Sequence, residues 1–173
     1  MDEFDEDAVR DMLAVTSIDF IGGSTMLDGE DVSGLIRTNE ISMAASNISK
    51  LAIVRAKVDE VSRHLAATKD VVMEGRDICT TVIPDAEVKI FMTASPEVRA
   101  KRRYEQLLAA GKEADYDTIF REVQERAYQD SHREVSPLRQ AEDAVFLDTS
   151  DLSIEEVVDA VAGIIKEKTG RTA

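Results

Sequence analysis

The sequence predicts an α/β fold with a parallel sheet, flanking helices and a small antiparallel insertion. Two observations support this fold class. Short apolar runs alternate with longer stretches of helical periodicity over residues 67–173, which is the pattern of a parallel sheet covered by helices. Near the N-terminus, two short apolar runs flank Gly22-Gly23, a hairpin signal. A length of 173 residues is within the usual size of one domain.

The composition restricts the partners that this chain can have. Its 43% apolar and 32% charged residues describe an ordinary folded protein, and its net charge of −14 disfavours nonspecific binding to nucleic acid or to an anionic membrane. The single cysteine excludes an internal disulfide and suits a reducing compartment. No apolar run approaches the length of a membrane span, and the acidic N-terminus does not resemble a signal peptide. We therefore expect a cytoplasmic protein.

The first third of the chain predicts a short helix, a hairpin and a helical pair. Residues 2–14 form an acidic-headed helix, and residues 16–21 and 25–27 form two antiparallel strands. Residues 38–67 are helical, with an interruption near Lys50. The apolar face of the second helical part consists of Val54, Val58, Val61 and Leu65.

The middle of the chain combines a predicted strand with charged residues. Residues 71–74 form an apolar run that predicts a buried strand, and Gly75, Arg76 and Asp77 follow it directly. Ligands bind at the carboxyl ends of parallel strands, where arginine suits a phosphate and aspartate a hydroxyl, an arginine or a hydrated metal. A structural ion pair would explain the same residues, so the pattern alone leaves both readings open.

A second strand, at residues 88–93, precedes a helix that is rich in cations. Ser95 is an N-cap, with proline following it at the first helical position, and Gly111 ends the helix. The cations on this helix are Arg99, Lys101, Arg102 and Arg103. A solvated helix face and an anion-binding surface both remain open here.

The next helix, at residues 116–133, has charged residues where its apolar stripe should continue. Arg126 lies seven residues beyond Ile119, Arg133 lies seven beyond Arg126, and Asp130 lies between them. Seven residues are nearly two helical turns, so these charges point inward. Inward charges need a partner or a ligand, which predicts either a buried ion-pair network or, as we favour, an anion-binding wall.

A third strand at residues 144–148 and a final helix complete the sheet region. Ser153 and Glu156 form a capping box at the start of that helix. His64 and His132 have no partners at a spacing that suggests a metal site.

Taken in order, many short stretches resemble the bacterial cytidylate kinases, the nucleoside monophosphate kinases that act on CMP and dCMP. The stretches that carry the resemblance are Gly29-Glu30-Asp31-Val32-Ser33, Ile36-Arg37-Thr38, Ala45-Ser46, Val54-Arg55, Gly75-Arg76-Asp77, Pro84-Asp85-Ala86, Lys89-Ile90-Phe91, Ala94-Ser95-Pro96-Glu97, Arg99-Ala100-Lys101-Arg102-Arg103-Tyr104, Gln124-Glu125-Arg126, Asp130, Arg133, Pro137-Leu138 and Leu147-Asp148-Thr149. The resemblance implies a parallel sheet like that of the P-loop kinases.

The resemblance also implies roles for individual residues. The side chains expected to hold the cytosine and sugar of the monophosphate are Ser46, Arg55 and Asp77. Those expected around its phosphate are Arg76, Arg126 and Arg133, with Asp130 orienting them or the sugar; Arg76, Asp77, Arg126 and Arg133 would form the catalytic set. Those expected to close over the phosphates of ATP are Arg99, Arg102 and Arg103. ATP would be the phosphoryl donor, with Mg²⁺.

Three regions are expected from the same resemblance. Residues 1–15 would form an N-terminal helix, and residues 16–66 a monophosphate-binding insertion. Residues 67–173 would form the parallel-sheet core, in which residues 99–133 are the lid.

The 173 residues contain no G-x-x-x-x-G-K-[ST] motif, the loop that holds ATP phosphates in kinases of this kind. Two hypotheses follow. In the first, the chain is a cytidylate kinase that lacks its N-terminal P-loop strand and helix and is inactive alone. In the second, it is a complete noncatalytic module that binds a pyrimidine monophosphate or a partner. The expected partners are CMP and dCMP, with no nucleic acid or membrane, and a monomer is expected if the chain is complete.

Overall fold

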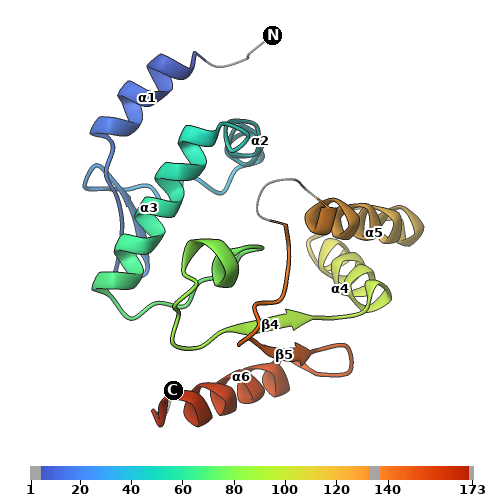
Figure 1. The fold of residues 1–173 in the computed structure, drawn as a ribbon. Coiled ribbons are helices and arrows are strands. Elements are labelled where there is room, and N and C mark those ends of the chain that lie inside the picture. Colours follow the sequence, from blue (N-terminus) through green and yellow to red (C-terminus); the bar gives the residue numbers. More distant parts are fainter. Residues whose placement is uncertain (1–4, 133–136, 172–173) are drawn as a thin grey trace. The chain divides into compact units, whose positions relative to one another are not determined.

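The computed structural model describes residues 5–132 and 137–171. The chain divides into two compact units, Met1–Val72 and Met73–Ala173, which are described separately below. The second unit contains a parallel strand pair with helices around it, and the first contains a small antiparallel sheet. The predicted α/β fold class is therefore confirmed (Figure 1).

The first unit begins with a capped helix and a three-stranded antiparallel sheet. Helix α1 (Glu6–Val15) starts at Asp5, whose carboxylate accepts from two backbone N–H groups of the first turn. Strands β1 (Ile18–Ile21) and β2 (Ser24–Leu27) form the predicted hairpin, and β3 (Glu30–Asp31) adds a short strand beyond the prediction.

Two helices complete the first unit, and the predicted interruption near Lys50 separates them. They are α2 (Asn39–Ile48) and α3 (Ala52–Thr68). Val54 and Leu65 on α3 are buried as predicted, whereas Val58, predicted on the same face, is exposed. Lys69 donates to the carboxylate of Asp19 on β1, which ties the end of α3 to the sheet.

The second unit is organised around two parallel strands. Strand β4 (Ile90–Thr93) pairs with β5 (Val145–Asp148) in register, Ile90 opposite Val145 and Thr93 opposite Asp148. The two arrows lie side by side in Figure 1, with α6 beside β5. Parallel strands place their carboxyl ends at one edge of the sheet, here beyond Thr93 and Asp148.

Three helices and one π-helical turn, η1 (Ile78–Val82), surround this pair. Helices α4 (Pro96–Ala109) and α5 (Tyr116–His132) begin close to the predicted positions, and Ser95 is the N-cap of α4 as predicted. They pack against one another through a cluster of aromatic rings from Tyr104, Tyr116 and Phe120. Helix α6 (Ile154–Thr169) starts with the predicted capping box, in which the Ser153 hydroxyl and Glu156 carboxylate each accept a backbone N–H.

The predicted strand at residues 71–74 is wrong. The structure assigns neither helix nor strand to residues 71–75. A strand exists only when its backbone groups pair with a neighbour, and no segment among the described residues supplies that partner. Val72 is accordingly 96% exposed despite its apolar, β-branched side chain.

A buried lysine fixes the start of β4. The side chain of Lys89 is only 7% exposed, and its Nζ lies 2.7 Å from Oδ2 of Asp143, just before β5. The same ammonium group donates to the backbone carbonyl of Pro84. This pairing lowers the pKa of the Asp143 carboxyl below its ordinary value, with the Lys89 hydrogen bond as the first cause.

No helix of residues 5–132 and 137–171 is long and apolar enough to cross a membrane.

Candidate functional site

An ion pair joins the Gly75-Arg76-Asp77 segment to helix α5. Arg76 Nε lies 2.8 Å from Asp130 Oδ2, with side-chain exposures of 46% and 20%. The backbone carbonyl of Asp130 also accepts a hydrogen bond of 2.7 Å from the N–H of Leu138. Two segments that are distant in the sequence, both predicted to bear on a phosphate, therefore meet.

The backbone around Arg76 is shaped by a close approach and a tight turn. A Cβ added to Gly75 would lie 2.6 Å from Cγ1 of Ile78, so only glycine fits without a shift of the isoleucine. The carbonyl of Asp77 accepts from the N–H groups of Thr80, Thr81 and Val82, which closes the turn that starts η1. The neighbour that requires glycine here is therefore a side chain of the protein itself.

The charged stripe of α5 is confirmed in part. Asp130 lies on the inward side and is half-buried against Arg76. The prediction that Arg126 also points inward is wrong in this structure, where it is exposed. Exposure lets the guanidinium stay hydrated and avoids the cost of burying its charge. Arg133 lies outside the described residues.

The three arginines of α4 have different surroundings. Arg102 donates to the hydroxyl and carbonyl of Thr149 and to the carbonyl of Leu152. Arg103 is exposed and donates to the side-chain amide of Gln106 across 2.8 Å. The Nε of Arg99 is buried and has no hydrogen-bond partner within the described part of the chain. The prediction that all three reach the phosphates of ATP stays a prediction.

A polar cluster at the carboxyl edge of β4 and β5 received no role from the sequence. The hydroxyl and backbone N–H of Ser150 both donate to Oδ1 of Asp148, and these bonds lower the pKa of the Asp148 carboxyl. Thr149, only 4% exposed, donates its hydroxyl to the carbonyl of Thr93 across 2.9 Å. The signal that could have revealed the cluster is the run of Asp, Thr and Ser directly after a strand, since short polar side chains often bond nearby backbone there.

Two predicted site residues belong to the other unit. Ser46 lies on α2, and the structure does not describe its side chain. Arg55 is half-buried on α3, directly after the buried Val54. Both residues belong to the first unit, Met1–Val72.

The residues described contain no group of three or more histidine, cysteine, aspartate or glutamate side chains that could hold a metal ion. No metal ligand is therefore assigned to these parts of the chain.

The fold and these side chains define a class: an α/β protein whose second unit combines parallel strands with arginines that suit an anionic ligand. Residues 1–167 match the family described as "Cytidylate kinase". The chain belongs to the cytidylate kinase family. The resemblance inferred from the sequence is thereby confirmed, and with it the assignment to nucleotide-binding kinases that use ATP as phosphoryl donor.

Several proteins named cytidylate kinase are similar to this chain over most of its length. The protein of Fervidobacterium nodosum is 44% identical over 161 residues, which are 93% of this chain and 74% of that protein. The protein of Thermosipho melanesiensis is 44% identical over 166 residues, 96% of this chain and 76% of that protein. The protein of Carboxydothermus hydrogenoformans is 46% identical over 168 residues, 95% of this chain and 76% of that protein.

Proposed function

We propose that this chain provides the monophosphate-binding part of a cytidylate kinase, which transfers the γ-phosphoryl group of ATP to CMP or dCMP and gives CDP or dCDP. The observation that best supports this assignment is the ion pair of Arg76 with Asp130. It brings the guanidinium of one predicted phosphate-binding segment to the helix that carries Arg126. Family membership supports the reaction, and this ion pair supports a substrate site beside Arg76.

The proposed division of labour follows from the chemistry of phosphoryl transfer. The transition state develops little new covalent bonding to the protein, so catalysis depends on alignment and on neutralising charge. Guanidinium groups do this well, because they present several donors in a plane and stay protonated. The arginines proposed for the CMP phosphate are Arg76, Arg126 and Arg133, and the residues proposed for the cytosine and sugar are Ser46, Arg55 and Asp77. Asp130 would hold Arg76 in place until the phosphate arrives.

Arginines of α4 are proposed for the phosphates of ATP. Arg99 and Arg103 lie one turn apart on this helix and so share a face. Mg²⁺ in kinases is bound largely through substrate phosphates, so we expect it to reach the reaction on the phosphates of ATP, and we assign it no ligand here.

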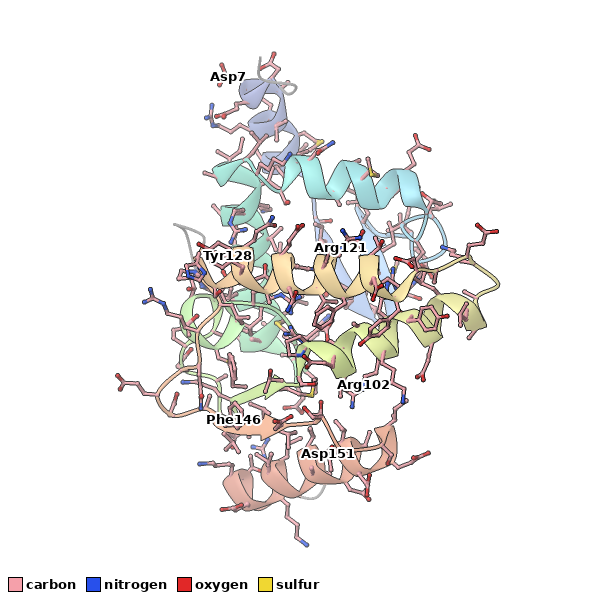
Figure 2. The ribbon with its side chains drawn as sticks, turned by 90° about the vertical axis from the view of Figure 1, so that its right-hand side faces the viewer. Asp7, Arg102, Arg121, Tyr128, Phe146 and Asp151 are labelled. Carbon is pink, nitrogen blue, oxygen red and sulfur yellow. The ribbon has the colours of Figure 1, made fainter. Side chains whose placement is uncertain are left out.

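Thermal unfolding with and without CMP tests the substrate site. At a concentration about 100 times the dissociation constant, CMP should add about 2.7 kcal/mol and raise Tm by roughly 5–10 °C. Arg126→Ala should abolish this rise, because a principal phosphate contact is lost. Arg121→Ala is the matched control: Arg121 lies on the same helix (Figure 2), and within the described residues it bonds to Asp117 and Thr118 of its own helix.

The control variant should keep the CMP-induced rise in Tm. Equal protection of the wild type and Arg126→Ala, or no protection of the wild type at saturating CMP, would contradict the proposed site.

The second candidate is a noncatalytic module that binds a pyrimidine monophosphate or a partner. Like the first candidate, it is compatible with the lack of a G-x-x-x-x-G-K-[ST] motif in the 173 residues. Both candidates predict CMP binding, and turnover separates them. For either, we propose a cytoplasmic location and no binding of nucleic acid, supported by the single cysteine and the net charge of −14. We propose a monomer if the chain is complete.

A further inference from the structure

Arg102 spans the whole connection between β5 and α6. Its guanidinium donates to Oγ1 of Thr149 across 3.1 Å and to the carbonyl oxygen of the same residue. It also donates to the carbonyl of Leu152 across 3.2 Å. Thr149 directly follows β5 and Leu152 directly precedes the N-cap of α6, so one side chain holds both ends of the connection. Figure 2 shows Arg102 on α4 and Asp151 in the facing connection.

The same connection is tied to the rest of the unit at two further points. Thr149 bonds Thr93 at the end of β4 through both its N–H and its hydroxyl, at 2.8 and 2.9 Å. The hydroxyl of Ser150 accepts from the N–H of Ser95, the N-cap of α4, across 2.9 Å. Without Arg102, the first half of the connection would keep these bonds, while Leu152 would lose its link to α4.

We propose that Arg102 is a positioning residue that fixes residues Thr149–Leu152 at the carboxyl edge of β4 and β5. Three hydrogen bonds to groups of the protein already use both terminal nitrogens of the guanidinium. Drawing these two nitrogens away would leave the carbonyl of Thr149, a residue only 4% exposed, without its guanidinium donor. The edge that Arg102 holds is the edge where α/β sheets bind their ligands.

The arginines of α4 therefore differ in their proposed roles. Among the described residues, Arg103 donates to an exposed glutamine side chain, a bond that a phosphate can replace at little cost. Arg99 has a buried Nε without a partner in the described part of the chain. These two remain the candidates proposed for an anion.

Hydrogen exchange of the nucleotide-free protein tests this role. We expect Arg102→Met to raise the exchange rate of peptides covering residues 148–153 by about fivefold or more, the change that corresponds to one lost hydrogen bond of about 1 kcal/mol. Lys101→Met is the matched control, because it removes one positive charge from the same helix. Lys101 is 70% exposed, and its nearest carboxylate, that of Glu105, lies 4.0 Å away. The control should leave the exchange of this segment unchanged.

The conservative variant Arg102→Lys separates geometry from charge. A lysine keeps the charge that a phosphate would need but cannot bridge a hydroxyl and two carbonyls as the planar guanidinium does. We therefore expect Arg102→Lys to exchange as fast as Arg102→Met. Normal protection in either variant would overturn the proposal. No nucleotide is present in this experiment, so its outcome is independent of whether the protein binds CMP.

Discussion

Arg76 Nε and Asp130 Oδ2 lie 2.8 Å apart, and this contact holds the loop before η1 against α5. The arginine is 46% exposed, so water screens the pair and its contribution to folding is small. We expect Asp130→Asn to change the free energy of unfolding by less than about 1 kcal/mol. Its effect on CMP binding should be larger, because Arg76 then has to be ordered by the ligand alone. Calorimetric titration with CMP should show a weaker affinity, by roughly tenfold.

A double-mutant cycle with Arg76→Gln gives the sharper test of that pair. If Asp130 acts through Arg76, the two substitutions together should weaken CMP binding no more than Arg76→Gln alone. Glu122→Gln, at an exposed position of the same helix, controls for the loss of one negative charge. Fully additive losses would show that Asp130 contacts the ligand independently.

The pairing of Lys89 with Asp143 predicts that the stability difference between wild type and Asp143→Asn depends on pH. The Lys89 hydrogen bond lowers the folded-state pKa of Asp143, so the ionised carboxyl is favoured by folding. Its contribution is fully present above the ordinary aspartate value of about 4 and is lost as pH falls through the lower folded-state pKa. Wild type should therefore be more stable than Asp143→Asn near pH 7, and the difference should shrink below about pH 4. Urea unfolding of both proteins from pH 7 to pH 3 measures it; an unchanged difference at every pH would contradict the assignment.

The side chain of Ile78 lies close to Gly75, so we expect any larger residue at position 75 to lower the free energy of unfolding. In Gly75→Ala the new Cβ would lie 2.6 Å from Cγ1 of Ile78, and displacement of that side chain should destabilise the protein by about 1–3 kcal/mol. Combining it with Ile78→Ala, which removes the clashing atom, should cost less than the sum of the two single changes. Gly163→Ala is the matched control, since nothing lies within 4 Å of its added Cβ on α6, and it should stabilise by up to about 1 kcal/mol. Chemical denaturation of the four variants provides the comparison.

Elements whose signals are local could be predicted from the sequence. The caps at Ser95 and Ser153 and the break near Lys50 depend on neighbouring residues alone, and the structure has all of them. The strand prediction for residues 71–74 is wrong because an apolar run becomes a strand only when another segment pairs with it.

In the candidate site, too, local patterns do not show which distant residues come together. Helical periodicity predicted that Asp130 points inward, but the exposed Arg126 on the same stripe shows that periodicity does not establish which charges are buried. The bonds of Arg102 to Thr149 and Leu152 join residues far apart in the chain. No spacing rule for a single helix can anticipate such contacts.

Turnover of the 173-residue chain separates the two candidate functions. The backbone N–H groups, lysine and hydroxyl of a G-x-x-x-x-G-K-[ST] loop hold ATP phosphates and magnesium in kinases of this kind, and these residues contain no such loop. The arginines of α4 supply charge but not that set of backbone donors, so ATP would not be aligned with CMP for in-line transfer. We expect negligible formation of CDP in a coupled ADP-release assay, even where CMP protects the same preparation from thermal unfolding. Turnover of roughly 1–100 per second, as in ordinary kinases, would show that the chain aligns ATP by other means.

Adding a separate polypeptide that carries the loop should restore turnover if the chain is the substrate-binding part of a kinase, and should leave it negligible if the chain is a noncatalytic module.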